Sequence, residues 1–223
     1  MILLSALFSF GKEYEVKVGE FSKLKVTDSI NIVHKCVNAQ DEHKSGTAWF
    51  DTNEDLADAF IFSNKGETLR IIISTEDAGK PGLPTIYLYS NFLVDVENGG
   101  LGEITIEDPA PCAKFNAKVI GNGSIVVKNL KTSFCKAFVD TGCGSIVIDG
   151  NTVKGEYRLV GTGLIQADRL KASEVVCKIM GSGSIGCDPA DKLTVKGIGS
   201  TKIYYKGTPQ IKKIGGGNLI NIK

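Results

Sequence analysis

GSGSIG, residues 181–186, is the stretch that decides the fold. Taken alone, it fits G-x-G-x-x-G, which holds the pyrophosphate of a dinucleotide when it lies between a strand and a helix. The residues that follow are CDPADKLTVKG (187–197), and Pro189 together with a second strand-like segment leaves no helix to complete such a site. The surroundings therefore favour a structural role for these glycines, and we expect no cofactor.

The pattern G-x-G-x-[Ile/Leu] recurs along the second half of the chain, with starts 16 to 21 residues apart. A repeat of nearly constant length indicates one structural unit used many times. Six copies begin at Gly100, Gly121, Gly142, Gly161, Gly181 and Gly215, and a looser copy, GIGSTKI, begins at Gly197. We expect each pair of glycines to form a sharp turn, where a positive φ or a close backbone approach excludes a Cβ atom. These turn glycines are Gly100, Gly102, Gly121, Gly123, Gly142, Gly144, Gly161, Gly163, Gly181, Gly183, Gly197, Gly199, Gly215 and Gly217.

Apolar residues alternate after most of the glycine pairs, as in Ile125 and Val127 or Ile146 and Ile148. Period two predicts a strand with one buried face. A second apolar stretch follows in most repeats, so each repeat holds at least two short strands. A repeat of about 20 residues is too short for a strand, a crossover helix and a return strand, which need about 30. The sequence therefore predicts an all-β solenoid with coils of about 20 residues, in which the isoleucines after each corner stack into a core column.

The N-terminal part lacks the glycine period but has the character of β structure. Alternating or apolar segments at 13–18, 30–33, 68–74 and 85–90 predict strands. Thr52 and Asp55 have capping-box spacing, which predicts a short helix at 53–59. We expect one domain over 12–223, with glycine-marked coils at 98–223 and N-terminal strands that begin and cap the solenoid. For residues 1–11, a degenerate or truncated export signal and an ordinary first strand both remain open.

The composition excludes several classes of function. Lysine and arginine number 26 against 25 aspartates and glutamates, and no basic run supplies a local field, so a nucleic-acid partner is not expected. No stretch is apolar for the length of about 20 residues that a transmembrane helix needs. The six cysteines lack C-x-x-C spacing and fit small buried side chains better than disulfides. Neither His34 nor His43 has an identifiable partner, so no catalytic residue is predicted.

Charged residues occupy the seventh position after the first glycine of five successive repeats. They are Glu107, Lys128, Asp149, Asp168 and Asp188. If the coils stack in register, the three aspartates lie about 5 Å apart, and clustered carboxylates suit Ca²⁺. The pattern favours a solvated polar turn, because charge runs usually mark solvated faces. We therefore predict no metal site, with a Ca²⁺ column at Asp149, Asp168 and Asp188 as the alternative.

Four segments together resemble the family called putative auto-transporter adhesin, head GIN domain, of Gram-negative cell envelopes. They are EFSKLKVTDSINIV (20–33), KSGTAWF (44–50), NEDLADAF (53–60) and IYYKGTPQIKKIGGGN (203–218), and the resemblance runs from about Phe21 to Lys223. It implies a single-stranded, right-handed β-helix-like fold with an N-terminal β cap, export from the cytoplasm, and an adhesive role.

Together these features predict a non-catalytic, extracytoplasmic binding protein of the periplasm, outer-membrane surface or secreted fraction. A stack of coils offers a long rigid face to a glycan or a surface protein, and it is compatible with a homo-oligomer. Two alternatives remain open, namely an enzyme acting on polysaccharide and a purely structural envelope protein. A cytoplasmic location also stays open, because the leader is atypical.

Overall fold

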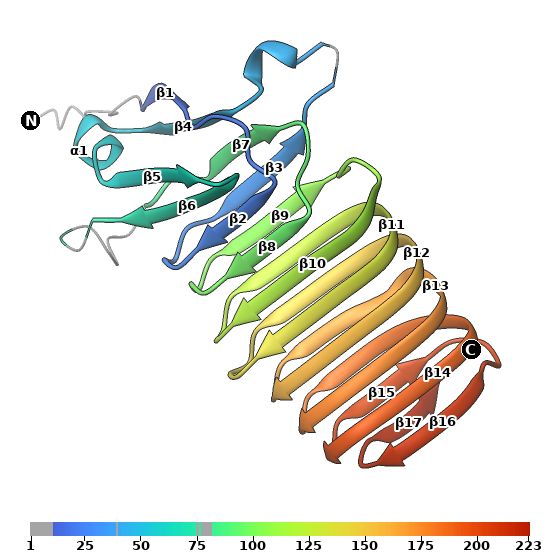
Figure 1. Ribbon diagram of the computed structural model, residues 1–223. Helices are drawn as coiled ribbons and strands as arrows, with labels where there is room; N and C mark the ends of the chain where they lie inside the picture. Colours follow the sequence, from blue (N-terminus) through green and yellow to red (C-terminus); the bar gives the residue numbers. More distant parts are fainter. Residues whose placement is uncertain (1–10, 39, 75, 77–81) are drawn as a thin grey trace, which may run out of the picture.

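The computed structural model describes residues 11–38, 40–74, 76 and 82–223, so the export signal or strand expected at 1–11 lies outside the described residues apart from Gly11. The structure is 67% strand and 3% helix and forms a solenoid of about six turns with a spacing of about 20 residues. In the part that is described, all strands join one 17-stranded sheet. Figure 1 shows the coils stacked in chain order from β10 towards β17. The prediction of an all-β solenoid is confirmed.

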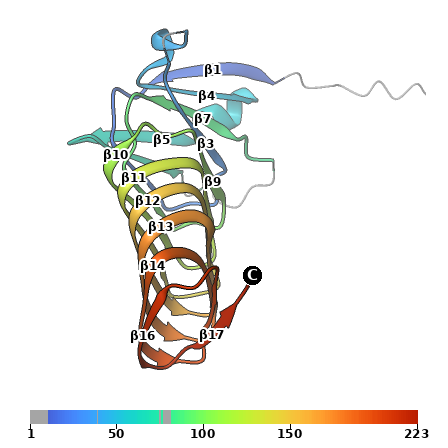
Figure 2. The same ribbon diagram turned by 90° about the vertical axis from the view of Figure 1, so that its right-hand side faces the viewer.

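Each regular coil is flattened into two walls that enclose the core. The long strands β11 (Ser124–Asp140), β12 (Ser145–Gly161), β13 (Leu164–Gly181) and β14 (Ser184–Gly199) each bend once, so their first halves lie in one wall and their second halves in the other. Figure 2 shows these bent strands stacked as narrow loops.

We call the two walls A and B. Besides the first halves of β11 to β14, wall A contains β7 (Ile86–Ser90), β3 (Ile32–Cys36), β9 (Glu103–Glu107), β15 (Lys202–Tyr205) and β17 (Asn218–Asn221). Besides the second halves, wall B contains β6 (Thr68–Ile73), β2 (Lys23–Val26), β8 (Asp95–Asn98), β10 (Cys112–Ile120) and β16 (Gln210–Gly215).

The first coils do not stack in chain order. Strand β2 pairs with both β6 and β8, and β3 pairs with both β7 and β9, so the coil β2–β3 lies between two coils that follow it in the sequence. Beyond β6 and β7, the end of the solenoid is covered by antiparallel strands, which Figure 1 shows at the N-terminal end. These are β1 (Lys12–Lys17), β4 (Thr47–Thr52) and β5 (Phe60–Lys65). The predicted N-terminal cap is confirmed.

The short helical elements lie in this cap. The helix α1 spans Glu54–Ala57, and a 3₁₀ turn, η1, spans Glu42–Lys44. Asn53 caps α1, since its Oδ1 accepts a hydrogen bond from the Leu56 backbone N at 2.9 Å. The predicted helix at 53–59 is therefore shorter than expected, and its expected cap at Thr52 is wrong. Thr52 is the last residue of β4, where it pairs with Lys12 of β1.

The core is a set of columns that run along the solenoid axis. One column in wall A holds equivalent residues of successive coils: Ile86, Ile32, Ile104, Ile125, Ile146, Ile165, Ile185, Ile203 and Leu219. Every isoleucine in this column is almost fully buried. Burial stabilises by about 1.5–3 kcal/mol for each such side chain. The predicted isoleucine column is confirmed, and Ile32 and Ile86 extend it into the N-terminal part.

All six cysteines lie in the described part of the chain and are free thiols. Cys135, Cys177 and Cys187 are buried, as predicted, whereas Cys143 is exposed at a corner. Burial raises the pKa of the Cys135 thiol to about 12, which suppresses the reactive thiolate. The buried cysteines therefore act as small core side chains.

Candidate functional site

The glycine corners join wall B to wall A and set how closely the coils approach. Gly161 has a φ of +105°, which side chains rarely adopt, and a Cβ atom there would lie 2.9 Å from the Gly142 carbonyl oxygen. At Gly183 the φ is ordinary, but a Cβ atom would lie 2.1 Å from the Gly163 carbonyl oxygen. Gly161 thus supplies a backbone conformation that favours glycine, and Gly183 permits close stacking of the coils.

The register changes where one repeat begins. Gly161 is opposite Gly181, and Gly181 is opposite Gly199, so the looser repeat starts at Gly199 rather than at Gly197. Thr201 occupies the place of its second glycine and donates a hydrogen bond from Oγ1 to the Gly181 carbonyl oxygen at 3.0 Å. The Thr201 hydroxyl bonds to the backbone of the preceding coil, which explains why this repeat tolerates a side chain at the position of the second glycine.

The column of charged residues is not in register over the three aspartates. Asp149 is opposite Arg169, and the register shifts again before Asp188, which is opposite Lys171. Asp168 forms an ion pair with Lys206, whose Nζ is 3.3 Å from Oδ2. Within the described residues, no group of three histidine, cysteine, aspartate or glutamate side chains has the geometry to hold a metal ion. The three aspartates therefore do not stack as one column of carboxylates.

The two histidines lie in different elements of the fold. His34 is fully buried, and its Nε2 is 2.8 Å from Ser90 Oγ. Burial lowers the pKa of His34 to about 3, so the ring is neutral. His43 lies in η1 on the cap. The His34–Ser90 pair is enclosed in the core, where no substrate reaches it, so it is a packing feature.

The outer surface of wall B is strongly cationic. Among the described residues of its strands, twelve lysines and arginines face outward, compared with five carboxylates. The cations are Lys23, Lys25, Arg70, Lys114, Lys118, Lys136, Lys154, Arg158, Lys178, Lys192, Lys196 and Lys212. The carboxylates are Asp95, Glu97, Asp140, Glu156 and Glu174. A protein of net charge +1 thus carries a local positive field on one wall.

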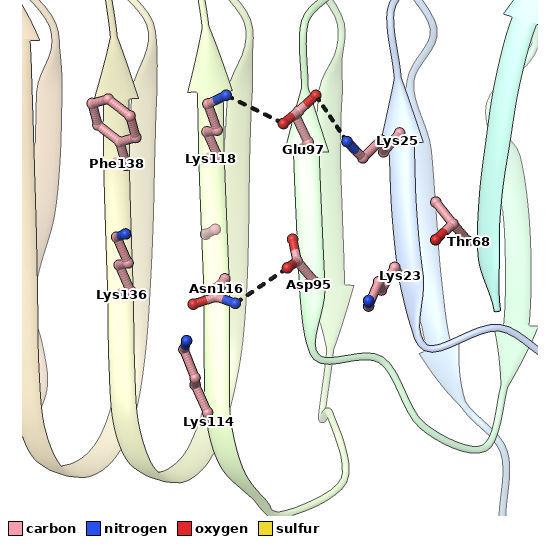
Figure 3. Close-up of a pocket in the computed structure, with 11 residues that line it drawn as sticks. Lys23, Lys25, Thr68, Asp95, Glu97, Lys114, Asn116, Lys118, Lys136 and Phe138 are labelled. Carbon is pink, nitrogen blue, oxygen red and sulfur yellow. Dashed lines mark hydrogen bonds and ion pairs between the residues drawn. The ribbon is translucent and has the colours of Figure 1, made fainter. Parts of the chain in front are cut away.

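A depression of about 480 Å³ lies in this wall, over β2, β6, β8, β10 and β11 (Figure 3). Its ion pairs centre on Glu97, whose carboxylate oxygens are 3.6 Å from Lys25 Nζ and 3.3 Å from Lys118 Nζ. Beside it, Asn116 Nδ2 donates a hydrogen bond to Asp95 Oδ2 at 3.2 Å. Both carboxylates of the depression are therefore already engaged, as the dashed lines in Figure 3 show.

Three lysines of the depression are not neutralised. Among the described residues, Lys23, Lys114 and Lys136 have no carboxylate within ion-pair distance. Next to Lys136 on the same strand is the half-buried Phe138. Its ring lies between two cations of neighbouring coils, with Lys118 Nζ 5.9 Å and the Arg158 guanidinium 4.7 Å from the ring centroid. Uncompensated ammonium groups and an aromatic ring in the same depression suit a ligand that carries negative charge on a flat apolar frame.

Sequence reasoning missed this site because its cations are about 20 residues apart in the chain. A signal was present, since a lysine or arginine stands three residues before several corner glycines. The examples are KVIG (118–121), RLVG (158–161) and KIMG (178–181). Stacking in register turns this spaced pattern into a continuous surface.

The comparisons with known proteins agree with this fold. The family model for putative auto-transporter adhesin, head GIN domain, matches residues 20–209. No curated protein matches the chain. In the described part, no helix has the length and apolar character to cross a bilayer.

Several solved structures have the same fold. A putative adhesin from Bacteroides fragilis NCTC 9343 superimposes with a TM-score of 0.83 at 21% identity, covering 96% of this chain and 98% of that chain. A putative adhesin from Parabacteroides distasonis ATCC 8503 has a TM-score of 0.72 at 19% identity and covers 95% and 97%. A structure from the same species, titled a putative lipid binding protein, has a TM-score of 0.67 at 21% identity and covers 97% and 98%. With a family model that matches most of its length, the chain belongs to the family of the putative auto-transporter adhesin, head GIN domain.

Proposed function

We propose that the protein is a non-catalytic, extracytoplasmic binding protein that holds an acidic glycan in the depression of wall B. The observation that carries this proposal is that three unpaired lysines, Lys23, Lys114 and Lys136, line one depression together with Phe138. Carboxylate or sulfate groups of a sugar chain pair with the ammonium groups, and the apolar face of a sugar ring packs on the phenyl ring. The adhesin name of the family supports a surface-binding role.

The rigidity of the site favours binding. Strands β8, β10 and β11 pair in parallel along the depression, so its side chains project from a fixed backbone. A pre-organised site loses little conformational entropy when a ligand binds. The same geometry gives little support to the enzymatic alternative, because a hydrolase needs a free acid and base, and here Asp95 and Glu97 are engaged by Asn116 and two lysines.

A glycan panel tests the proposal. Purified protein is incubated with neutral glycans and with carboxylated or sulfated ones, and both binding and reaction products are measured. We expect saturable binding to the acidic glycans, no product, and an affinity that falls as salt rises.

The variants Lys136→Glu and Phe138→Ala should each weaken binding by about tenfold, as expected for loss of one charge-assisted or stacking contact. Lys202→Glu, an exposed change on wall A, is the matched control and should leave binding unchanged. Turnover of a glycan would replace the proposal with an enzymatic function. Failure to bind any acidic glycan would contradict it and favour a structural role.

A further inference from the structure

We infer that a second part of wall B docks on the surface of an anionic lipid bilayer. The surface consists of two adjacent rows on β12, β13 and β14, close to the glycine corners. One row is Arg158, Lys178 and Lys196, and the other is Val160, Met180 and Ile198. We call these six residues the cationic–apolar ladder. It goes beyond the proposed glycan site, whose unpaired lysines and aromatic ring lie on other strands or earlier in the stack.

The apolar row is exposed although the fold does not require it. The relative exposure is 53% for Met180 and 67% for Ile198. The inward positions beside them are held by Ile179, which is buried, and by Gly197. A polar side chain at either exposed position would therefore leave the core intact. Exposed apolar side chains that line up over successive coils indicate an interaction surface rather than isolated surface residues.

The cationic row keeps positive charge available. Lys196 has no carboxylate within ion-pair distance in the described part, and Arg158 stacks on Phe138 instead of pairing with an acid. Lys178 is paired with Glu156 at 2.9 Å. No carboxylate interrupts either row between β12 and β14. The nearest acid along the apolar row is Asp140, opposite Val160 on the preceding strand, and it marks where the ladder begins.

The corner next to the ladder is also free of negative charge over the same coils. Its exposed residues are Thr162, Ser182 and Ser200. This combination of apolar side chains, adjacent cations and small hydroxyl residues is what an interfacial surface requires. The apolar row enters the boundary between headgroups and acyl chains, while lysine and arginine remain at the level of the lipid phosphates.

A bilayer fits the ladder better than a soluble acidic polymer does. A polymer would be held by the cations alone and would leave Met180 and Ile198 in water. The ladder lines a separate shallow region close to the glycine corners and is not part of the depression that Lys136 lines. Adjacent coils are about 4.8 Å apart, so the three cations span about 10 Å, within reach of neighbouring lipid headgroups.

Vesicle flotation with the full chain tests this inference. The protein is mixed with vesicles of phosphatidylglycerol and phosphatidylcholine or with vesicles of phosphatidylcholine alone. We expect partition into the anionic vesicles only. The double variant Met180→Ser/Ile198→Ser should lower partition about tenfold, and each of Lys178→Gln and Lys196→Gln about fivefold.

The matched control is Val153→Ser. Val153 is 60% exposed near the middle of β12, seven residues before Val160 and away from the glycine corner, and this change should leave partition unchanged. Equal partition into both kinds of vesicle, or full partition by the Met180→Ser/Ile198→Ser variant, would overturn the inference. It would also be overturned if the ladder variants abolished binding to a soluble acidic polysaccharide while the wild-type protein ignored vesicles.

The two proposals on wall B fail separately. Lys136→Glu should weaken glycan binding and retain most vesicle binding, whereas Met180→Ser/Ile198→Ser should do the reverse. If no glycan binds but anionic vesicles do, only the proposed function is lost.

Discussion

Wall A and wall B are built from the same coils, yet they present different charge to solvent. On the strands of wall A, excluding the antiparallel cap and considering only described residues, the outward side chains include five cations and five carboxylates. They are Lys35, Lys128, Arg169, Lys171, Lys202, Glu103, Glu107, Asp149, Asp168 and Asp188. Wall B has twelve cations and five carboxylates by the same count. A nearly neutral solenoid can thus separate its charges by wall, because each position of the repeat becomes a row.

The interiors of the walls differ as well. Wall A has aligned isoleucines with one buried histidine, His34, in the next column. Wall B has mixed side chains, in which Ala137, Tyr157 and Cys177 occupy equivalent places. A uniform column packs without adjustment, whereas unequal side chains must compensate for one another between coils. Each wall therefore has a different residue at which the packing of the core can be tested.

The largest effect is expected where the two walls meet. Gly161→Val forces a branched side chain into a φ of +105° and against the Gly142 carbonyl, so we expect a loss of about 3–5 kcal/mol in the free energy of unfolding. Chemical denaturation measures it. Gly66→Ala is the control, because Gly66 has a φ of +56° but open space around it, and should cost only about 1–2 kcal/mol. Equal losses would show that close stacking at the corner is unimportant.

A smaller effect concerns the interior of wall A. His34 has a pKa of about 3 when folded and an ordinary value of 6.5 when unfolded, so acid favours the unfolded chain. Its contribution is fully present above pH 6.5 and is lost as the pH falls towards 3. The slope is at most about 1.4 kcal/mol per pH unit.

Denaturation curves from pH 7 to pH 5 measure this effect against His34→Gln, which keeps a polar partner for Ser90. We expect the wild-type protein to lose about 2 kcal/mol more than the variant over that range. Parallel pH profiles would contradict the burial of a neutral ring.

The smallest effect concerns the interior of wall B. Among the described residues, the buried Tyr157 hydroxyl has no hydrogen-bond partner, and it lies beside the space that Gly155 leaves open. Removing an unsatisfied hydroxyl recovers its desolvation cost, so Tyr157→Phe should raise the free energy of unfolding by about 1–2 kcal/mol. Thermal melting at neutral pH checks this prediction. A lower melting temperature would mean that the hydroxyl has a partner in solution, and Tyr205→Phe, a less buried position, serves as the control.

The sequence predicts this fold where the repeat is strict. The alternation after each glycine pair places Ile125, Ile146 and Ile165 in one column, because equal spacing leads to equal positions in a stack. It fails where the spacing changes. The register shifts after Val147 in β12 and after Ala167 in β13, so Asp149, Asp168 and Asp188 do not align as their numbering suggests.

The spaced lysines and arginines indicate the candidate site only in part, for a related reason. Lys118, Phe138 and Arg158 come from three coils, and only the register of β10, β11 and β12 puts the two cations on either side of the ring. Lys23 and Lys25 join them through an exchange of coil order that no local pattern encodes. The sequence also did not predict the unsatisfied Tyr157 hydroxyl, because the alternation of apolar residues indicates which side chains are buried but not whether their polar atoms find hydrogen-bond partners.

The position of the β2–β3 coil constrains how the chain is assembled. Both of its neighbours, β6–β7 and β8–β9, are synthesised later, and the Val94 backbone N returns to bond the Ser22 carbonyl oxygen at 2.9 Å. The stack therefore cannot grow from the N-terminus in one direction only. The β2–β3 coil keeps at least one open strand edge until residues as far as Glu107 have emerged, and such edges are where unfolded chains pair with each other. The later coils, from β10 to β14, add in chain order onto a finished template, so slow folding and aggregation should be confined to the first half of the molecule.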